Sequence, residues 1–410
     1  MNTNNAGNAN IKNNNNKNDT ERKPKSKTKS KAKIIILSIV LLILASLVAV
    51  VVYTVGFHVP SNQIDETKPF QTHPSTQPTE SNESTNQTDF TEEQKKIFNF
   101  LVIGRDQTGA NTDVIMIINY NVMTGKISVL QIPRDTYVEF NGISYKINSL
   151  YAVFYAEGQN KNEKSPDNYS LKKLANTLEK NLCINIHYYS MVNLIGFRNI
   201  VDILGGVKLD IPADMDYDDP SQDLHIHLKK GLQTLNGKKA EEFVRFRSGY
   251  VQADIGRMDA QKIFMSSLLK TVKENFNITT IVKIANEVYK NVITDLPLDD
   301  MVFFAKNILS IDMNNITFMS MPGKSARSNG DDGIWYYVMN RKAVINIIQK
   351  YFNIYSDVVI DDVIFDPNRV FTSLKKYPHI NSLYNEETEI DENSHSASSI
   401  NEDGIKIPRY

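Results

Sequence analysis

The sequence predicts a sandwich-like α/β domain, with a central mixed β-sheet flanked by helices, preceded by one N-terminal transmembrane helix. Two observations predict this arrangement. Between residues 98 and 352, short runs rich in β-branched and aliphatic residues alternate with longer stretches of helical apolar spacing, which is typical of a sheet covered by helices. Ahead of them, residues 34–56 contain no charged side chain and exceed the roughly 20 residues that a helix needs to cross a bilayer.

The charges on either side of this apolar segment predict its orientation. A basic run extends from Lys17 to Lys33 before it, whereas the first lysine after it is Lys68. Because positive residues favour the cytoplasmic side, we expect a single-pass type II protein of the cell membrane with its C-terminal domain outside the cell. A cleaved signal peptide is the alternative, but its apolar region is normally only about 7–15 residues long. We therefore favour an uncleaved anchor.

Composition divides the remainder of the chain. The polar segments on both sides of the anchor and the acidic C-terminal end have too few apolar residues to form a core. We therefore expect a disordered basic tail at 1–33, an extracellular linker at 57–90, a folded domain at 91–355, and a C-terminal extension at 356–410 that is disordered from about residue 386.

Charge and cysteine content exclude some classes of function. The 46 Lys and Arg residues balance 47 Asp and Glu residues, so the net charge of −1 argues against a nucleic-acid partner. Cys183 is the only cysteine, which rules out an intrachain disulfide and a thiolate-rich zinc site.

Three apolar runs at the start of the domain predict strands at 98–104, 113–120 and 126–132. The short connection 121–125 ends in Gly125 and predicts a hairpin turn. In an antiparallel meander, the ends of the first and third strands lie at the same sheet edge as the start of the second. That edge would bring together Arg105, Asp106, Asp113, Arg134 and Asp135.

The rest of the domain continues the alternation of strands and helices. Capping-box spacing after Thr91 predicts a short opening helix, and Gly205-Gly206 predicts the end of another. Further strands are expected at 187–193, 207–211, 316–321 and 334–338, and helices at 149–157, 170–182, 194–204, 257–276, 281–292, 299–309 and 341–352.

Two local spacings indicate shared faces. In an extended segment, Arg245 and Arg247 would project together while Phe246 faces the core. On a helix, Arg257 and Gln261 would lie on one face, four residues apart.

Seven blocks together resemble one family: FLVIGRDQ (100–107), NTDVIMI (111–117), VLQIPRDTYVEF (129–140), KINSLYA (146–152), HYYSMVNLIGFRNIVDILGGV (187–207), GLQTLNGKKAEEFVRFR (231–247) and DIGRMDAQ (254–261). In order and spacing they are similar to the LytR-CpsA-Psr (LCP) phosphotransferases, and the resemblance covers residues 98–275. It implies an LCP-type catalytic domain in cell-wall biogenesis. Such an enzyme transfers a glycopolymer, such as teichoic acid or capsule, from an undecaprenyl-pyrophosphate donor to a peptidoglycan hydroxyl with the help of Mg²⁺.

The resemblance also assigns residues. It implies that the catalytic residues are Asp106, Asp113, Arg134, Arg245 and Arg247. It places Arg134, Lys146, Arg245, Arg247, Arg257 and Gln261 at the pyrophosphate. Asp106 and Asp113 are the expected magnesium ligands. These residue types suit phosphoryl transfer, since guanidinium groups grip phosphate bidentately and carboxylates hold hard cations.

One departure from the family pattern leaves alternatives open. Asn111 precedes Thr112-Asp113, where the family often has arginine, and Arg105 is a possible substitute for that positive charge. A non-catalytic protein that binds lipid-linked glycans, or an envelope regulator, is one alternative function. A polyprenyl pyrophosphate hydrolase, which would pass water instead of a sugar hydroxyl, is another.

Overall fold

The computed structural model describes residues 60, 96–105, 112–220, 224–246, 253–275, 277–308, 311–328, 333–352, 378–386 and 398–399. Within these ranges no helix has the length and apolar content needed to cross a membrane. The predicted basic tail, transmembrane helix, linker and opening helix at Thr91 lie outside the described residues, apart from Pro60.

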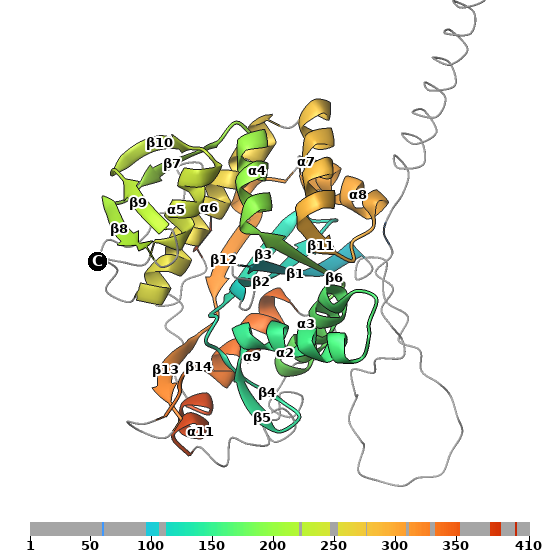
Figure 1. The fold of residues 1–410 in the computed structure, drawn as a ribbon, viewed down its shortest axis with the longest axis vertical. Coiled ribbons are helices and arrows are strands. Elements are labelled where there is room, and N and C mark those ends of the chain that lie inside the picture. The colour runs from blue at the N-terminus through green and yellow to red at the C-terminus, as the bar shows by residue number, and fades with distance from the viewer. Residues whose placement is uncertain are drawn as a thin grey trace, which may run out of the picture. The chain divides into compact units, whose positions relative to one another are not determined.

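A seven-stranded mixed sheet forms the centre of the domain, in the order β11-β6-β1-β2-β3-β12-β15 (Figure 1). The predicted meander is confirmed, because β1 pairs with β2 and β2 with β3, both antiparallel. Parallel neighbours β6 and β12 extend it on either side. The strands are β1 (Ile97–Arg105), β2 (Thr112–Asn121), β3 (Lys126–Ile132), β6 (Tyr188–Asn193), β11 (Val292–Thr294), β12 (Ile316–Ser320) and β15 (Ser398–Ser399).

The turn between β2 and β3 shows why glycine ends it. Gly125 has a φ of +66°, which side chains with a Cβ rarely adopt, and its N–H donates to the carbonyl of Asn121 at 2.9 Å. The register that follows, Asn121 opposite Lys126, aligns the two strands so that the ends of β1 and β3 reach the same edge.

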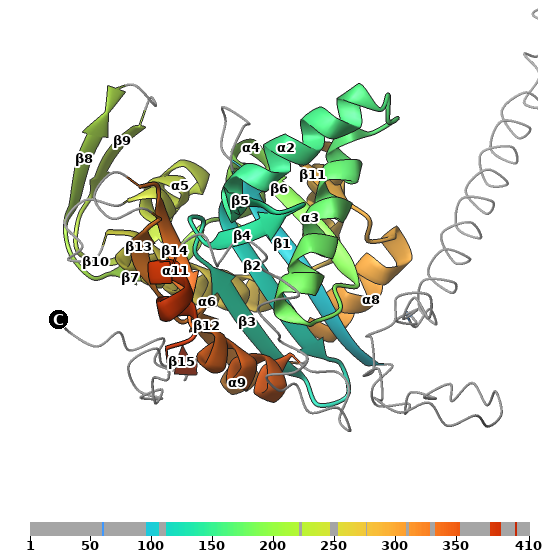
Figure 2. The same ribbon diagram turned by 90° about the horizontal axis from the view of Figure 1, so that it is seen from below.

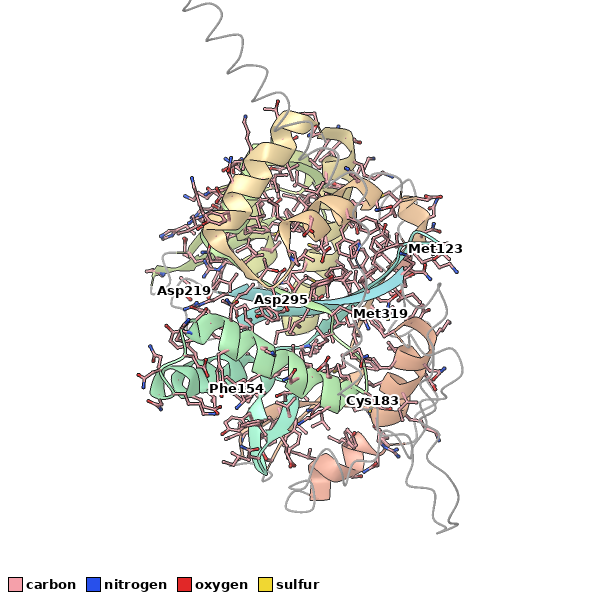
Figure 3. All side chains as sticks on the ribbon, turned by 90° about the vertical axis from the view of Figure 1, so that its right-hand side faces the viewer. Met123, Phe154, Cys183, Asp219, Asp295 and Met319 are labelled. Carbon is pink, nitrogen blue, oxygen red and sulfur yellow. The ribbon has the colours of Figure 1, made fainter. Side chains whose placement is uncertain are left out.

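Helices cover both faces of the sheet, as the alternating pattern predicts (Figure 3). One face packs on α2 (Ile147–Asn160), α3 (Pro166–Leu182) and α9 (Arg341–Tyr351), around buried residues such as Leu101, Phe154 and Leu174. The other packs on α6 (Ala253–Asn275) and α8 (Leu298–Ile308), around Phe98 and Phe304. The sandwich-like α/β class is therefore confirmed.

The elements that carry a smaller apolar cluster stand beside the sheet (Figure 2). It is built from two hairpin-like strand pairs and from helices α4 (Leu194–Ile203), α5 (Gly237–Arg245) and α6. The strand pairs are β7 (Val207–Ile211) with β10 (Gly231–Leu235), and β8 (Met215–Asp219) with β9 (Leu224–Leu228). As predicted, the two glycines Gly205 and Gly206 follow the end of α4. Gly206 has a φ of +91°, and a Cβ there would lie 2.9 Å from the carbonyl oxygen of Leu235.

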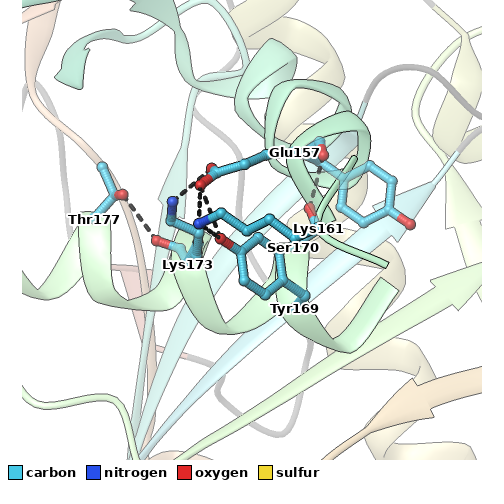
Figure 4. Close-up of polar contacts among 7 residues, drawn as sticks. Glu157, Lys161, Tyr169, Ser170, Lys173 and Thr177 are labelled. Atoms are coloured by element: carbon cyan, nitrogen blue, oxygen red, sulfur yellow. Dashed lines mark hydrogen bonds and ion pairs between the residues drawn. The ribbon is translucent and has the colours of Figure 1, made fainter. Parts of the chain in front are cut away.

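Polar side chains join α2 to α3 (Figure 4). Glu157 accepts from Lys161 at 2.8 Å and from Lys173 at 2.5 Å, and Tyr169 donates to the same carboxylate at 2.9 Å. These donors hold the pKa of Glu157 down at about 2. The pair of helices is therefore fixed at both a buried apolar surface and a charged outer edge.

Two further hairpins were not predicted as such: β4 (Tyr137–Phe140) with β5 (Ile143–Lys146), and β13 (Gly323–Arg327) with β14 (Trp335–Met339). The helices α7 (Ile278–Asn291) and α11 (Pro378–Tyr384) complete the longer elements. Ile380 and Tyr384 of α11 are buried in the main core, so part of the C-terminal extension packs on the domain.

Candidate active site at the sheet edge

The end of β1 and the start of β2 meet at an irregularity in the ladder. Gly104 pairs with Val114, but the next residue of β1, Arg105, pairs with Thr112. Asp113 is thus the extra residue of a β-bulge, a feature that redirects a side chain and often lies next to active sites.

Asp113 contacts the arginine that follows β3. Arg134 Nη1 donates to Asp113 Oδ1 at 3.1 Å, and the two side chains are 24% and 32% exposed. Arg134 begins a turn closed by the Thr136 N–H and hydroxyl, which both donate to the carbonyl of Pro133. The predicted meeting of Asp113 and Arg134 at the shared edge is confirmed.

Lys146 reaches the same turn from β5. Its ammonium lies 3.1 Å from Asp135 Oδ1, and the backbone N–H of Asn148 donates to the carbonyl of Arg134 at 3.1 Å. On the other side, the N–H of Tyr337 in β14 donates to the carbonyl of Asp135 at 2.8 Å. Two hairpins therefore support the loop that carries Arg134, and Asp135 has the structural role of pairing with Lys146.

Arg105 leaves the sheet edge toward α2 and α3. Its Nη1 donates to the hydroxyl of Tyr151 at 3.2 Å and lies 3.4 Å from Asp167 Oδ1. Sequence reasoning missed Tyr151 and Asp167. Asp167 in the first turn of a helix predicts only capping, and only the fold brings it to Arg105.

Arg245 lies at the end of a helix, which corrects the prediction of an extended Arg245-Phe246-Arg247 segment. It is the last residue of α5, and the helical hydrogen-bond pattern continues through the Phe246 N–H to the carbonyl of Glu242. Phe246 at the C-cap has an extended backbone, but Arg245 is helical, so the strand alternation does not apply to Arg245. Phe246 does face the core, at 6% exposure.

A buried glutamate balances the positive charge at this helix end. Arg245 Nη1 donates to Glu241 Oε1 at 2.8 Å, and Arg198 Nε lies 3.4 Å from the other carboxylate oxygen. The Glu241 side chain is only 6% exposed. Its four-residue spacing from Arg245 is a helical pairing signal that was available in the sequence.

Gln261 connects three elements. Its amide group bonds the side chain of Gln131 in β3 and donates to the carbonyl of Val244 in α5 at 3.2 Å. The residue is 7% exposed. Gln261 thereby holds the end of α5 next to β3, and a direct contact with pyrophosphate stays a prediction.

Three of the predicted site residues fall on parts of the chain that the structure does not describe. Asp106 and Arg247 lie outside the described residues, as does the side chain of Arg257. Among the described residues there is no group of three or more His, Cys, Asp or Glu side chains suited to hold a metal ion. His225 and His227 are exposed on β9 and pair with Asp218 and Asp216 across the β8–β9 hairpin, at 2.5 and 2.6 Å.

The LytR_cpsA_psr family model matches residues 65–353, which is more than half of the chain. The chain belongs to the LytR_cpsA_psr family. The matched range includes the whole sheet edge described above, from Arg105 to Gln261.

Named relatives within the family indicate its chemistry. The polyisoprenyl-teichoic acid–peptidoglycan teichoic acid transferase TagU of Bacillus cereus is 31% identical over 255 residues, covering 61% of this chain and 76% of the relative. TagU of Oceanobacillus iheyensis is 30% identical over the same length, covering 61% of this chain and 74% of the relative.

Solved structures share the fold. TagV of B. subtilis superposes with a TM-score of 0.52 at 24% identity, over 66% of this chain and 98% of TagV. A structure titled "TagT bound to LIIa-WTA" gives a TM-score of 0.51 at 20% identity, over 67% of this chain and 97% of TagT. At these identities, the likeness concerns the LCP fold alone.

Proposed function

We propose that this protein is a phosphotransferase that moves a glycopolymer from an undecaprenyl-pyrophosphate donor to a hydroxyl of peptidoglycan. The acceptor oxygen forms a bond to the sugar-linked phosphorus, and the bond from that phosphorus to the bridging oxygen breaks. Undecaprenyl phosphate leaves, and the hydroxyl proton passes to a base. The product is a phosphodiester between glycan and cell wall.

The contact between Asp113 and Arg134 is the observation that supports this function best. It puts a guanidinium and a carboxylate together at the end of the sheet, 3.1 Å apart and both accessible from solvent. Phosphoryl transfer needs fixed positive charge around the phosphate oxygens rather than covalent chemistry by the protein. TagU relatives of 31% identity are named for the same reaction class.

Each charged residue has a role in this proposal. Arg134, Arg245 and Arg247 bind the transferred phosphoryl group, with Lys146, Arg257 and Gln261 at the rest of the pyrophosphate. Lys146 approaches the Arg134 turn, where its ammonium lies 3.1 Å from Asp135. Asp113 or Asp106 orients or deprotonates the attacking hydroxyl.

We further propose Mg²⁺ as the cofactor, held by Asp113 and Asp106. Magnesium usually binds through one or two carboxylates and substrate phosphates while it keeps several waters. Asp113 fits this requirement as a carboxylate at the bulge, 32% exposed. The ion would supply charge to the pyrophosphate oxygens, and Asp113 must then divide its oxygens between the cation and Arg134.

A type II anchor at 34–56 would place this domain on the outer face of the membrane. Its support is the uncharged apolar run and the basic residues before it. A lipid-linked donor and a cell-wall acceptor meet only at that face.

The test uses the full-length protein in lipid nanodiscs with a lipid-linked glycan, peptidoglycan oligomers and Mg²⁺. We expect undecaprenyl phosphate release and glycan attachment to peptidoglycan in equal amounts. Asp113→Ala should lose both while it keeps the wild-type circular dichroism spectrum. Release without attachment would instead support a hydrolase, and donor binding without release would support a binding protein.

A further inference from the structure

Arg105 is held along one edge of its guanidinium. Its Nη1 contacts the Tyr151 hydroxyl at 3.2 Å and Asp167 Oδ1 at 3.4 Å, and its Cζ lies 5.2 Å from the centre of the Tyr151 ring. Arginine has five N–H donors. Within the described ranges, the Nε and Nη2 groups of Arg105 have no protein acceptor, so part of the fork is available to a ligand.

The two groups that hold Arg105 are themselves fixed. Tyr151 is 1% exposed in α2, and its hydroxyl donates to Asp167 Oδ1. Burial and the hydrogen bond to Asp167 raise the pKa of Tyr151, so the phenol stays protonated and keeps donating. Asp167 lies in the first turn of α3, which begins at Pro166 after a Ser165 cap. The guanidinium therefore rests on two helices that are packed against each other.

The contacts of Arg105 with the two helices use few of its donors. Arginine–carboxylate pairs are frequently bidentate, with two parallel N–H···O bonds. Here Asp167 and Tyr151 share the single Nη1 group, and the Arg105 side chain remains 28% exposed. Tyr151 and Asp167 therefore orient the Arg105 guanidinium through Nη1 alone.

Arg105 also lies beside the proposed transfer site. It pairs with Thr112 at the bulge, one residue from Asp113, whose carboxylate contacts Arg134. We propose that Arg105 binds a phosphate of the lipid-linked pyrophosphate donor, and that Tyr151 and Asp167 are positioning residues for its guanidinium. This inference rests on the proposed function, which assigns Arg105 no role.

The experiment measures binding of a short-chain polyprenyl pyrophosphate and steady-state transfer, with the full-length protein in nanodiscs. Arg105→Gln should raise the donor Kd and KM by at least about tenfold, the worth of a charge-assisted hydrogen bond. Arg105→Lys, which keeps the charge but not the fork, should recover part of that loss. Tyr151→Phe and Asp167→Asn should raise KM by smaller factors at nearly unchanged kcat.

Glu157→Gln is the matched control, because it removes the ion pair between Glu157 of α2 and Lys173 of α3. Each of these residues lies six positions, or about 9 Å along its helix, beyond Tyr151 or Asp167. It should leave donor KM unchanged. If both Arg105 variants bind the pyrophosphate as tightly as the wild type, or if the variants lower only the Tm, the inference is overturned and the proposed function stands. If the wild type itself binds no polyprenyl pyrophosphate, the proposed function fails, and this inference with it.

Discussion

Removal of the Arg134 guanidinium should lower the rate of transfer strongly and the free energy of unfolding only slightly. Arg134→Ala deletes a positive charge that lies 3.1 Å from Asp113 at the proposed transfer site. Loss of one preorganised donor to a developing charge costs about 10²–10³ in kcat, or about 2.7–4 kcal/mol of transition-state stabilisation. The fold should lose far less. The pair is 24% and 32% exposed, so solvent screening limits its contribution to the free energy of unfolding to about 1 kcal/mol or less.

The assay follows undecaprenyl phosphate release under saturating donor, with thermal unfolding measured on the same preparations. We expect a fall of two to three orders of magnitude in rate and a decrease of no more than about 2–4 °C in Tm. Arg341→Ala is the control, since it removes another partly buried guanidinium. The Nε of Arg341 donates to Asn385 Oδ1 at 3.1 Å, and neither residue belongs to the proposed transfer site. Wild-type turnover in Arg134→Ala would refute the assignment, and a loss of folding in proportion to activity would show that the pair is structural.

Three further outcomes are expected. The pKa of Glu157 is about 2 in the fold, below its ordinary value of 4.5. Its ion pairs therefore stabilise the protein fully above pH 4.5 and lose that effect as the pH falls toward 2. Urea unfolding across this range should show a free energy of unfolding that falls with pH, and Glu157→Gln should reduce that fall. Phe154→Ala, at a side chain with 0% exposure, should lower the free energy of unfolding by about 3–5 kcal/mol, and equal urea midpoints would argue against its burial. Chelation of divalent cations should abolish transfer and added Mg²⁺ restore it, whereas undiminished transfer in chelator would contradict a metal at Asp113.

The positions of the first three strands followed from the sequence because apolar periodicity is local. The apolar runs at 98–104, 113–120 and 126–132 lie within β1, β2 and β3, and the last has the predicted bounds. Once these strands alternate in direction, the chain itself dictates that their polar ends share an edge. The meeting of Asp113 and Arg134 therefore needed no tertiary information beyond that alternation.

The helical end of α5 shows where local pattern was insufficient. Arg245-Phe246-Arg247 alternates like a strand, yet Arg245 completes a helix whose capping Asn236 lies well before the motif. A three-residue alternation is compatible with either state. In the fold, Phe243 on the helix and Phe246 at its C-cap both pack into the smaller cluster.

The sequence by itself determined the apolar anchor-like segment, the α/β class, and the edge at which charged residues gather. Only the tertiary structure decided how those charges are used. Asp113 is set by a bulge, Arg105 bonds Asp167, which is 62 residues away, and Gln261 is buried against Gln131 at a separation of 130 residues. Such partners are chosen by the packing of α2, α3 and α6 on the sheet, because a side chain's contacts depend on which surfaces meet in space, and no local spacing records that.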